Sequence, residues 1–402
     1  MTEAQKTVLN LTSAALFGTP VTIPSETDWQ AVYDEIKSQE VVALLYPLSL
    51  DLDIPKDVLK QWSEDRDKYL LNNAKNISGH FAVQKLMDEA GIPCVILKGL
   101  ASASYYPDYL LRAYGDVDFL VPKEDYRKAS KFLEKNGFDY LNRHDRHLIY
   151  SRGGILYELH KDIVGLPTTS IRKVFYEYFS DIFDSATPFE HRGSICMIPS
   201  SRHHSVILLV HMAWHLSKSG VGLRHLCDWA VFVNSMPDSF FENDMQEVLK
   251  EMGLWHFAEI LTSLCEEYLG LQRHSWVDRP SVDYLSALID DIFDAGAFGR
   301  IHDEAVLKNP TLKTRRADLI SAETLKAFFA SLNKGARTVI PASSEHPILL
   351  PAGWTYVMGR YMIRTLSGKR SVGKARENIV RLGKRKELSE EWQLFESQEK
   401  QL

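Results

Sequence analysis

The sequence feature that most constrains the fold is one short block of β-type segments in a chain that is otherwise helical in pattern. Its first segment is a short apolar run rich in β-branched residues, which predicts a buried strand. Arg152-Gly153-Gly154 separates the last two segments and suits a hairpin turn. A helix is expected over residues 123–136, and strands over residues 92–97, 116–121, 138–142, 147–151 and 155–160.

The segments on either side of this block have apolar residues three and four positions apart, the spacing of amphipathic helices. The clearest lie over residues 29–45, 59–90, 201–217, 224–235, 241–253, 255–269, 282–295 and 354–366. We therefore predict an α+β fold, in which a small mixed sheet is flanked by N-terminal helices and a larger C-terminal helical region. The predicted parts are a helical region over 1–90, the α/β core over 91–165, a helical region over 166–366 and a charged tail over 367–402.

Composition places this chain of 402 residues, 45% hydrophobic and 25% charged, among soluble globular proteins. The net charge of -6 argues against a chain-wide nucleic-acid surface, so any such contact is expected only through the basic tail. Four scattered cysteines fit a reducing compartment and offer no zinc framework. Without a signal-peptide pattern or an apolar stretch of membrane-spanning length, we expect a cytoplasmic protein with no membrane contact.

The acids at the start of the second predicted strand point to a metal. Asp116 and Asp118 are two residues apart, so their side chains lie on one face of the strand. Two neighbouring carboxylates repel each other unless a cation lies between them. A divalent ion with oxygen ligands suits this pair, most simply Mg²⁺, with Mn²⁺ as an alternative. Glu158, on a later strand, is the expected third carboxylate, both as a metal ligand and as a general base.

A phosphate-binding turn is predicted just upstream. Lys98-Gly99 leaves a strand and opens a helix, and Gly99 lets phosphate oxygens approach the backbone. Lys98 supplies positive charge, and Ser102 or Ser104 supplies a hydroxyl. Two further side chains have open alternatives. Arg112 either neutralises a triphosphate or forms a salt bridge with an aspartate, and His160 contacts a phosphate, holds Glu158 or is an ordinary buried histidine.

A group of histidines follows in the C-terminal helical region. His204, His211 and His215 fall on one face of a predicted helix, and His225 and Asp228 follow on the next. Histidines at positions i and i+4 can bind a transition metal, which leaves open a metal-dependent hydrolase. We favour an acceptor-binding role for His211, His215 and Asp228, beside the alternative that these residues only pack the helix against the sheet.

The motifs resemble those of a bacterial family of uncharacterised nucleotidyltransferases within the polymerase-β-like superfamily. The matching segments are Leu97-Lys98-Gly99, Tyr105-Tyr106, Leu111-Arg112, Asp116-Val117-Asp118 and Tyr157-Glu158-Leu159-His160. The resemblance implies the superfamily's minimal core, a helical remainder, Mg²⁺ and an NTP donor. It also implies that Asp116, Asp118 and Glu158 are the three acidic residues and that Gly99 is the glycine of the first motif. In the wider superfamily that motif is Gly-Ser or Gly-Gly, where this chain has Lys98-Gly99-Leu100.

The sequence therefore predicts an enzyme that transfers an NMP group from an NTP to an unidentified acceptor, a small molecule or a protein, and releases pyrophosphate. The placed acids and the phosphate turn motivate this prediction. The alternative is a catalytically inactive module that binds a nucleotide and serves a pathway partner.

Overall fold

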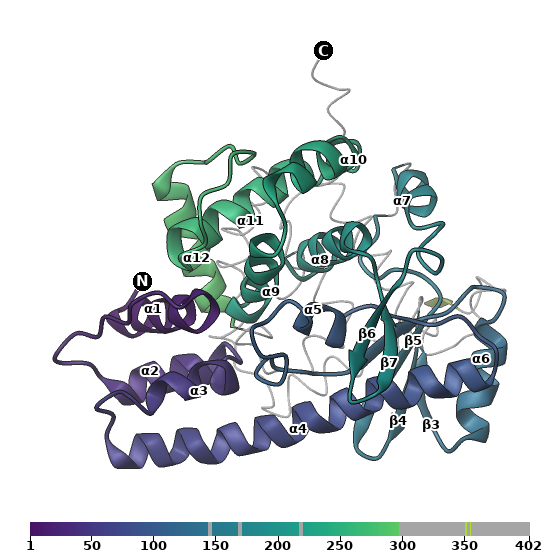
Figure 1. Cartoon of the computed structure of the whole chain (residues 1–402), viewed down its shortest axis with the longest axis horizontal. Coiled ribbons are helices and arrows are strands. Elements are labelled where there is room, and N and C mark those ends of the chain that lie inside the picture. Colours follow the sequence, from purple (N-terminus) through teal and green to yellow (C-terminus); the bar gives the residue numbers. More distant parts are fainter. Residues whose placement is uncertain (144–146, 168–170, 217–219, 297–349, 352–353, 355–402) are drawn as a thin grey trace. The chain divides into compact units, whose positions relative to one another are not determined.

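The computed structural model describes residues 1–143, 147–167, 171–216 and 220–296, with residues 350, 351 and 354. The chain divides into two units, Met1–Arg300 with Trp392–Leu402, and Ile301–Glu391. The helices and strands labelled in Figure 1 all belong to the first unit. The helix predicted over residues 354–366, apart from Trp354, and the charged tail predicted over 367–402 lie outside the described residues.

The core of the first unit is a five-stranded mixed sheet, which confirms the predicted α+β class. Strands β2 and β5 are parallel, and the other neighbouring pairs are antiparallel. Every residue of β2 is buried, because helices and neighbouring strands enclose this strand. In spatial order the strands are β1 (Val95–Ile96), β2 (Val117–Leu120), β5 (Ile155–His160), β4 (His147–Arg152) and β3 (Asp139–Arg143).

The N-terminal region is helical, and its longest element supports the sheet. Helix α4 has 34 residues and runs beside the strands in Figure 1. Its Val83 and Met87 belong to the same buried core as Phe119 of β2. The single helix predicted over residues 29–45 is two helices, because Glu40 takes a positive φ of 57° between them. The four helices are α1 (Glu3–Phe17), α2 (Trp29–Ser38), α3 (Val42–Ser49) and α4 (Lys56–Glu89).

Strand β1 and the helix after β2 are shorter than the sequence pattern predicts. Helix α5 (Leu100–Ala103) is a single turn after Gly99, and helix α6 (Tyr126–Lys135) follows β2. Strand β1 has only two paired residues of the six predicted. The apolar run around it is nevertheless buried, so burial rather than strand pairing explains the sequence pattern.

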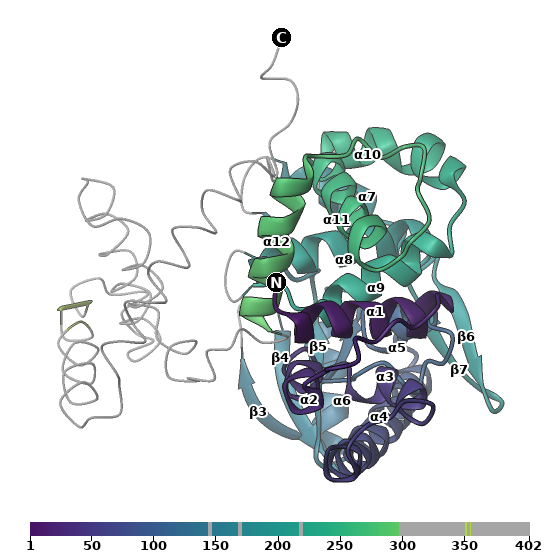
Figure 2. The ribbon, with the colours of Figure 1, turned by 90° about the vertical axis from the view of Figure 1, so that its left-hand side faces the viewer.

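A hairpin that the sequence analysis missed interrupts the C-terminal helices. Strands β6 (Thr187–His191) and β7 (Ser194–Ile198) pair around Arg192 and Gly193, both at positive φ. Figure 2 shows this hairpin at the edge of the molecule. Cys196 and Ile198 of β7 join the core around the main sheet. The helical region predicted over residues 166–366 therefore also contains a β-hairpin.

Apart from the helix at residues 172–178, which no predicted range covers, the remaining helices follow the predicted ranges in the described part of the chain. Together with that helix, they are α7 (Arg172–Tyr178), α8 (Ser201–Leu216), α9 (Leu223–Asn234), α10 (Gln246–Glu251), α11 (Trp255–Tyr268) and α12 (Val282–Ala295). A π-helical turn, Phe240–Met245, leads into α10 where a single helix was expected. None of the described helices is both long and apolar enough to cross a membrane.

Candidate active site

The sheet brings the three predicted carboxylates together. Asp118 of β2 is the register partner of Glu158 on the parallel strand β5, so the two side chains share one face. Asp116 lies just before β2, two residues earlier on the same face. Carboxylate oxygens of all three lie within 4.8 Å of one another. This group, Asp116, Asp118 and Glu158, is called the acid cluster below.

Lys98 and His160 each contact one carboxylate oxygen of Asp118. The Lys98 ammonium lies 3.0 Å from Asp118 Oδ2, and His160 Nε2 donates to Asp118 Oδ1 at 2.8 Å. The same His160 nitrogen lies 3.3 Å from Glu158 Oε2. The neighbouring strand β4 adds His147, whose Nε2 is 3.4 Å from that Glu158 oxygen. Of the three roles left open for His160, the structure therefore supports contact with the acids.

The charges of the acid cluster do not balance. Burial disfavours the anion of Asp118, but the Lys98 ammonium and the hydrogen bond from His160 outweigh it and hold the pKa of Asp118 well below its usual range. At Asp116, burial and then the charge of Asp118 outweigh Lys98, so the pKa of Asp116 is raised. A divalent cation would relieve this repulsion, so the residues present fit a metal. His147, Glu158 and His160 form a second group that could hold one.

The predicted phosphate turn has a tight backbone. Gly99 has a φ of 60°, a conformation that residues with a Cβ rarely adopt. A Cβ at this position would also lie 2.7 Å from Nε2 of His80, a fully buried histidine of α4. His80 Nδ1 donates to the carbonyl of Asn76, which leaves Nε2 facing the glycine. Because α5 is only one turn long, its N-terminus supplies a much smaller dipole than a full helix would.

Ser102 is placed differently from its predicted role. Its side chain is only 1% exposed, and its hydroxyl has no hydrogen-bond partner among the described residues. Ser104, the alternative, donates to the carbonyl of Ala101. The structure therefore gives no support to a hydroxyl contact with phosphate from either serine, and that contact stays a prediction.

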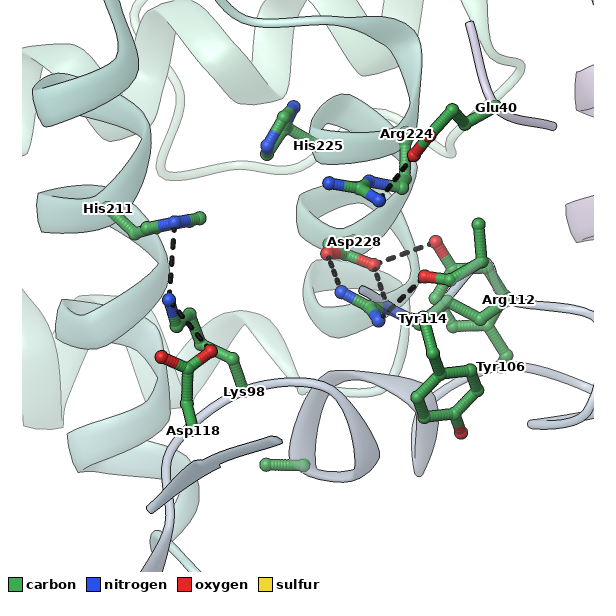
Figure 3. A network of polar contacts seen from close by, with 12 residues as sticks. Glu40, Lys98, Tyr106, Arg112, Tyr114, Asp118, His211, Arg224, His225 and Asp228 are labelled. Atoms are coloured by element: carbon green, nitrogen blue, oxygen red, sulfur yellow. Dashed lines mark hydrogen bonds and ion pairs between the residues drawn. The ribbon is translucent and has the colours of Figure 1, made fainter. Parts of the chain in front are cut away.

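Of the two alternatives for Arg112, a triphosphate or a salt bridge with an aspartate, the structure shows a salt bridge, and its partner is Asp228, for which acceptor binding was favoured. Both are buried, with 8% and 5% exposure. The guanidinium donates twice to the carboxylate, each time at 2.7 Å, and Tyr106 donates to the same carboxylate at 2.8 Å (Figure 3). Arg112 also donates to the carbonyl of Ala113, in the segment that leads to Asp116. The partner of Arg112 is thus an aspartate of α9, outside the acid cluster.

The histidines of α8 and α9 form a separate group beside Lys98. His211 and His215 of α8 have their Nε2 atoms 3.0 Å apart, and His225 of α9 completes a group within 4.8 Å. Figure 3 shows Lys98 between His211 and Asp118, with 3.5 Å from its Nζ to His211 Nε2. His204, predicted on the same face, instead stacks on Tyr105.

Comparison with known proteins now assigns the chain to a family. A family model described as an uncharacterised nucleotidyltransferase matches residues 25–270, more than half of the chain. The chain is a member of this nucleotidyltransferase family. No functionally curated protein matches the chain. The matched range includes the sheet, the acid cluster and helices α8 and α9, so the family relationship inferred from the motifs is confirmed.

Two histidines of this nucleotidyltransferase, His147 and His80, were missed by the sequence analysis, and a third, His225, was given no role of its own. His147 could have been found, because a hairpin closed by Gly153 and Gly154 puts residue 147 opposite residue 160. His225 was noted only as part of the following helix. His80 carries no local signal, since it lies on α4 and reaches Gly99 only through the tertiary fold.

Proposed function

We propose that this nucleotidyltransferase transfers an NMP group from an NTP to an acceptor hydroxyl or phosphate, with Mg²⁺ held by Asp116, Asp118 and Glu158. The observation that carries the proposal is the acid cluster, in which three carboxylates from adjacent parallel strands converge within 4.8 Å. Lys98 and His160 compensate the negative charge only in part, as the raised pKa of Asp116 indicates. Family membership supports nucleotidyl transfer as the reaction class.

In this reaction an acceptor oxygen forms a bond to the α-phosphorus of the NTP. The bond from that phosphorus to the oxygen that bridges it to the β-phosphorus breaks, and pyrophosphate leaves. We assign Glu158 as the base that takes the proton of the acceptor oxygen. When bound, the metal supplies positive charge to the phosphate oxygens. Gly99 contributes a close backbone approach, and Lys98 contributes a second positive charge beside Asp118.

A second candidate is a nucleotide-binding module without catalysis. The observation in its favour is that both carboxylate oxygens of Asp118 already have partners, the Lys98 ammonium and the His160 ring. These contacts compete with a metal at Asp118, because a divalent ion and an ammonium repel each other. The module would then hold the metal of an NTP through Asp116 and Glu158 without aligning it for transfer. Both candidates require metal-dependent binding of an NTP. They therefore differ only in turnover.

The deciding experiment measures release of pyrophosphate and label transfer from each α-labelled NTP, with Mg²⁺ and a panel of acceptors that includes cell extract. The variant Asp116→Ala/Asp118→Ala should lose transfer by at least about 10²- to 10³-fold, as expected when electrostatic stabilisation of a transition state is removed. The chain offers a matched control in Asp51→Ala/Asp53→Ala, which changes a second Asp-x-Asp at exposed positions.

Transfer by the wild type and the control, but not by the acid-cluster variant, supports the enzyme. Metal-dependent NTP binding without turnover across the whole panel supports the binding module instead. If wild type and Asp116→Ala/Asp118→Ala bind NTP and release pyrophosphate equally, the acid cluster has neither role.

A further inference from the structure

The group formed by His211, His215 and His225 lies next to the acid cluster but is not part of it. Lys98 joins the two, since its ammonium is 3.0 Å from Asp118 and 3.5 Å from His211. We call Lys98 and the three histidines the nitrogen cluster. Its members come from the β1–α5 turn and from helices α8 and α9. Figure 3 shows Lys98 joined to His211, with His225 on the neighbouring helix α9.

Hydrogen bonding fixes the proton position on His225. The Gly222 amide donates to His225 Nδ1, which must therefore be an acceptor. The proton of the neutral ring then lies on Nε2, and that N–H has no partner among the described residues. His225 is only 3% exposed, so this is a buried donor that still needs an acceptor. A metal at Nε2 would have to displace this proton.

The surrounding charges also disfavour a metal at the nitrogen cluster. After burial, the groups that act most strongly on His211 are the Lys98 ammonium, His215, His225 and Arg224, and all of them lower its pKa. After burial, the pKa of His225 is lowered in the same way by the charges of His215, Arg224, Arg112 and Lys98. The lowered pKa of His211 and of His225 means that a further positive charge is disfavoured at this place, although Lys98, Arg112 and Arg224 each already pair with a carboxylate, that of Asp118, Asp228 or Glu40. The nitrogens within 4.8 Å of one another are close enough to surround one oxyanion.

We propose that the nitrogen cluster binds a phosphate group of the acceptor, through the Lys98 ammonium and the His225 N–H with His211 and His215 lining the site. The assignment to the acceptor rests on the proposed function, whereas the anion site itself does not. Under the proposed function, the nucleotide's own phosphates are assigned to the metal at the acid cluster, which Lys98 borders through Asp118. A phosphate at the nitrogen cluster would also give Lys98 a second anionic partner beside Asp118.

The test is calorimetric titration of the full chain with inorganic phosphate at pH 7.5, without nucleotide or metal. We expect one phosphate site, weakened about tenfold or more in His225→Leu and in His211→Leu, as for a lost hydrogen bond to a charged group. His256→Leu is the matched control, because this half-exposed histidine of α11 lies outside the cluster. Circular dichroism verifies that each variant folds. If His225→Leu does not fold, the phosphate affinity of His211→Leu decides, because His211 is only half-buried.

A second arm identifies the source of the phosphate. If the site belongs to the acceptor, inorganic phosphate still binds when a non-hydrolysable NTP analogue and Mg²⁺ are saturating, and Asp116→Asn weakens the analogue but not phosphate. Competition between the analogue and phosphate would assign the cluster to the nucleotide and overturn the proposal. Phosphate binding that His211→Leu and His225→Leu leave unchanged would overturn it as well.

Elemental analysis of the purified protein tests whether the nitrogen cluster binds a metal instead of an anion. Stoichiometric zinc, manganese or iron that is lost in His211→Leu would make the cluster a metal site and overturn the proposal. If no nucleotidyl transfer is ever found while phosphate binding depends on His211 and His225, the proposed function fails and the anion site stands. The two failures are thus distinguishable.

Discussion

Two groups of ionisable side chains include the two ends of the segment from Arg112 to Asp118, and they differ in charge balance. In the first, Arg112 and Asp228 form a one-to-one pair, with two hydrogen bonds of 2.7 Å and a third from Tyr106. In the second, three carboxylates share Lys98 and His160, and the pKa of Asp116 is raised. Evenly matched charge indicates a structural role, and unmatched charge indicates a site for a ligand.

In the sequence, Arg112 and Asp228 resemble ligand-binding residues, but in the structure each is the partner of the other. An arginine near an Asp-x-Asp suits a triphosphate, but here its fork is occupied by a carboxylate of α9. The same arginine donates to the carbonyl of Ala113, so the pair connects α9 to the backbone that enters β2. Its effect on the acid cluster is therefore one of position.

The largest expected effect is on the balanced pair. Asp228→Asn leaves the buried guanidinium of Arg112 without its counter-charge, and we expect a loss of about 3–5 kcal/mol in the free energy of unfolding. Chemical denaturation measures it. The double variant Arg112→Met/Asp228→Leu should recover much of the loss, because no buried charge is then left alone. An exposed pair provides the control, since Glu64→Gln removes the partner of Lys60 and should change stability by less than about 0.5 kcal/mol.

A smaller effect is expected at the turn that borders the acid cluster. Gly99→Ala forces a Cβ into a positive-φ backbone and to within 2.7 Å of His80 Nε2, so we expect a loss of about 1–3 kcal/mol. Gly137→Ala is the matched control, because Gly137 has a φ of 77° but no other atom would lie within 4 Å of the Cβ that alanine adds there. Thermal or chemical unfolding measures both variants. Equal losses in the two would show that His80 imposes no constraint on the turn.

Much of this arrangement could be predicted from the sequence, because it depends on local periodicity. The Asp116–Asp118 spacing sets a shared face, and the hairpin glycines set the register of β4 and β5, which fixes Glu158. The amphipathic helices α8, α9, α11 and α12 also follow from spacing alone. In these cases the decisive interactions lie within one element or between strands joined by a short turn, except for the pairing of β2 with β5 that brings Asp118 beside Glu158.

What could not be predicted depends on contacts between distant segments. Arg112 meets Asp228, and Gly99 meets His80, only after the helices have packed. The β6–β7 hairpin was missed because its exposed residues lack a clear apolar alternation, although Arg192-Gly193 is a turn signal. Sequence patterns thus identified the residue types of the site, and the tertiary fold determined their partners.

The smallest expected effect is a gain in stability, opposite in sign to the loss expected when the balanced pair is broken. Burial and the Asp118 charge raise the pKa of Asp116, so between the ordinary carboxyl pKa and this raised value the folded state holds a proton that the unfolded chain has lost. That contribution to stability is present at low pH and is lost as pH rises through the folded pKa. Asp116→Asn stays neutral, so it should match the wild type near pH 4 and exceed it by at least about 1 kcal/mol at pH 8, the free energy of a one-unit pKa shift. Thermal unfolding across this range measures the difference, and added Mg²⁺ should stabilise the wild type but not the variant. A variant that is less stable than the wild type at pH 8 without Mg²⁺ would mean that Asp116, like Asp228, is already matched in charge.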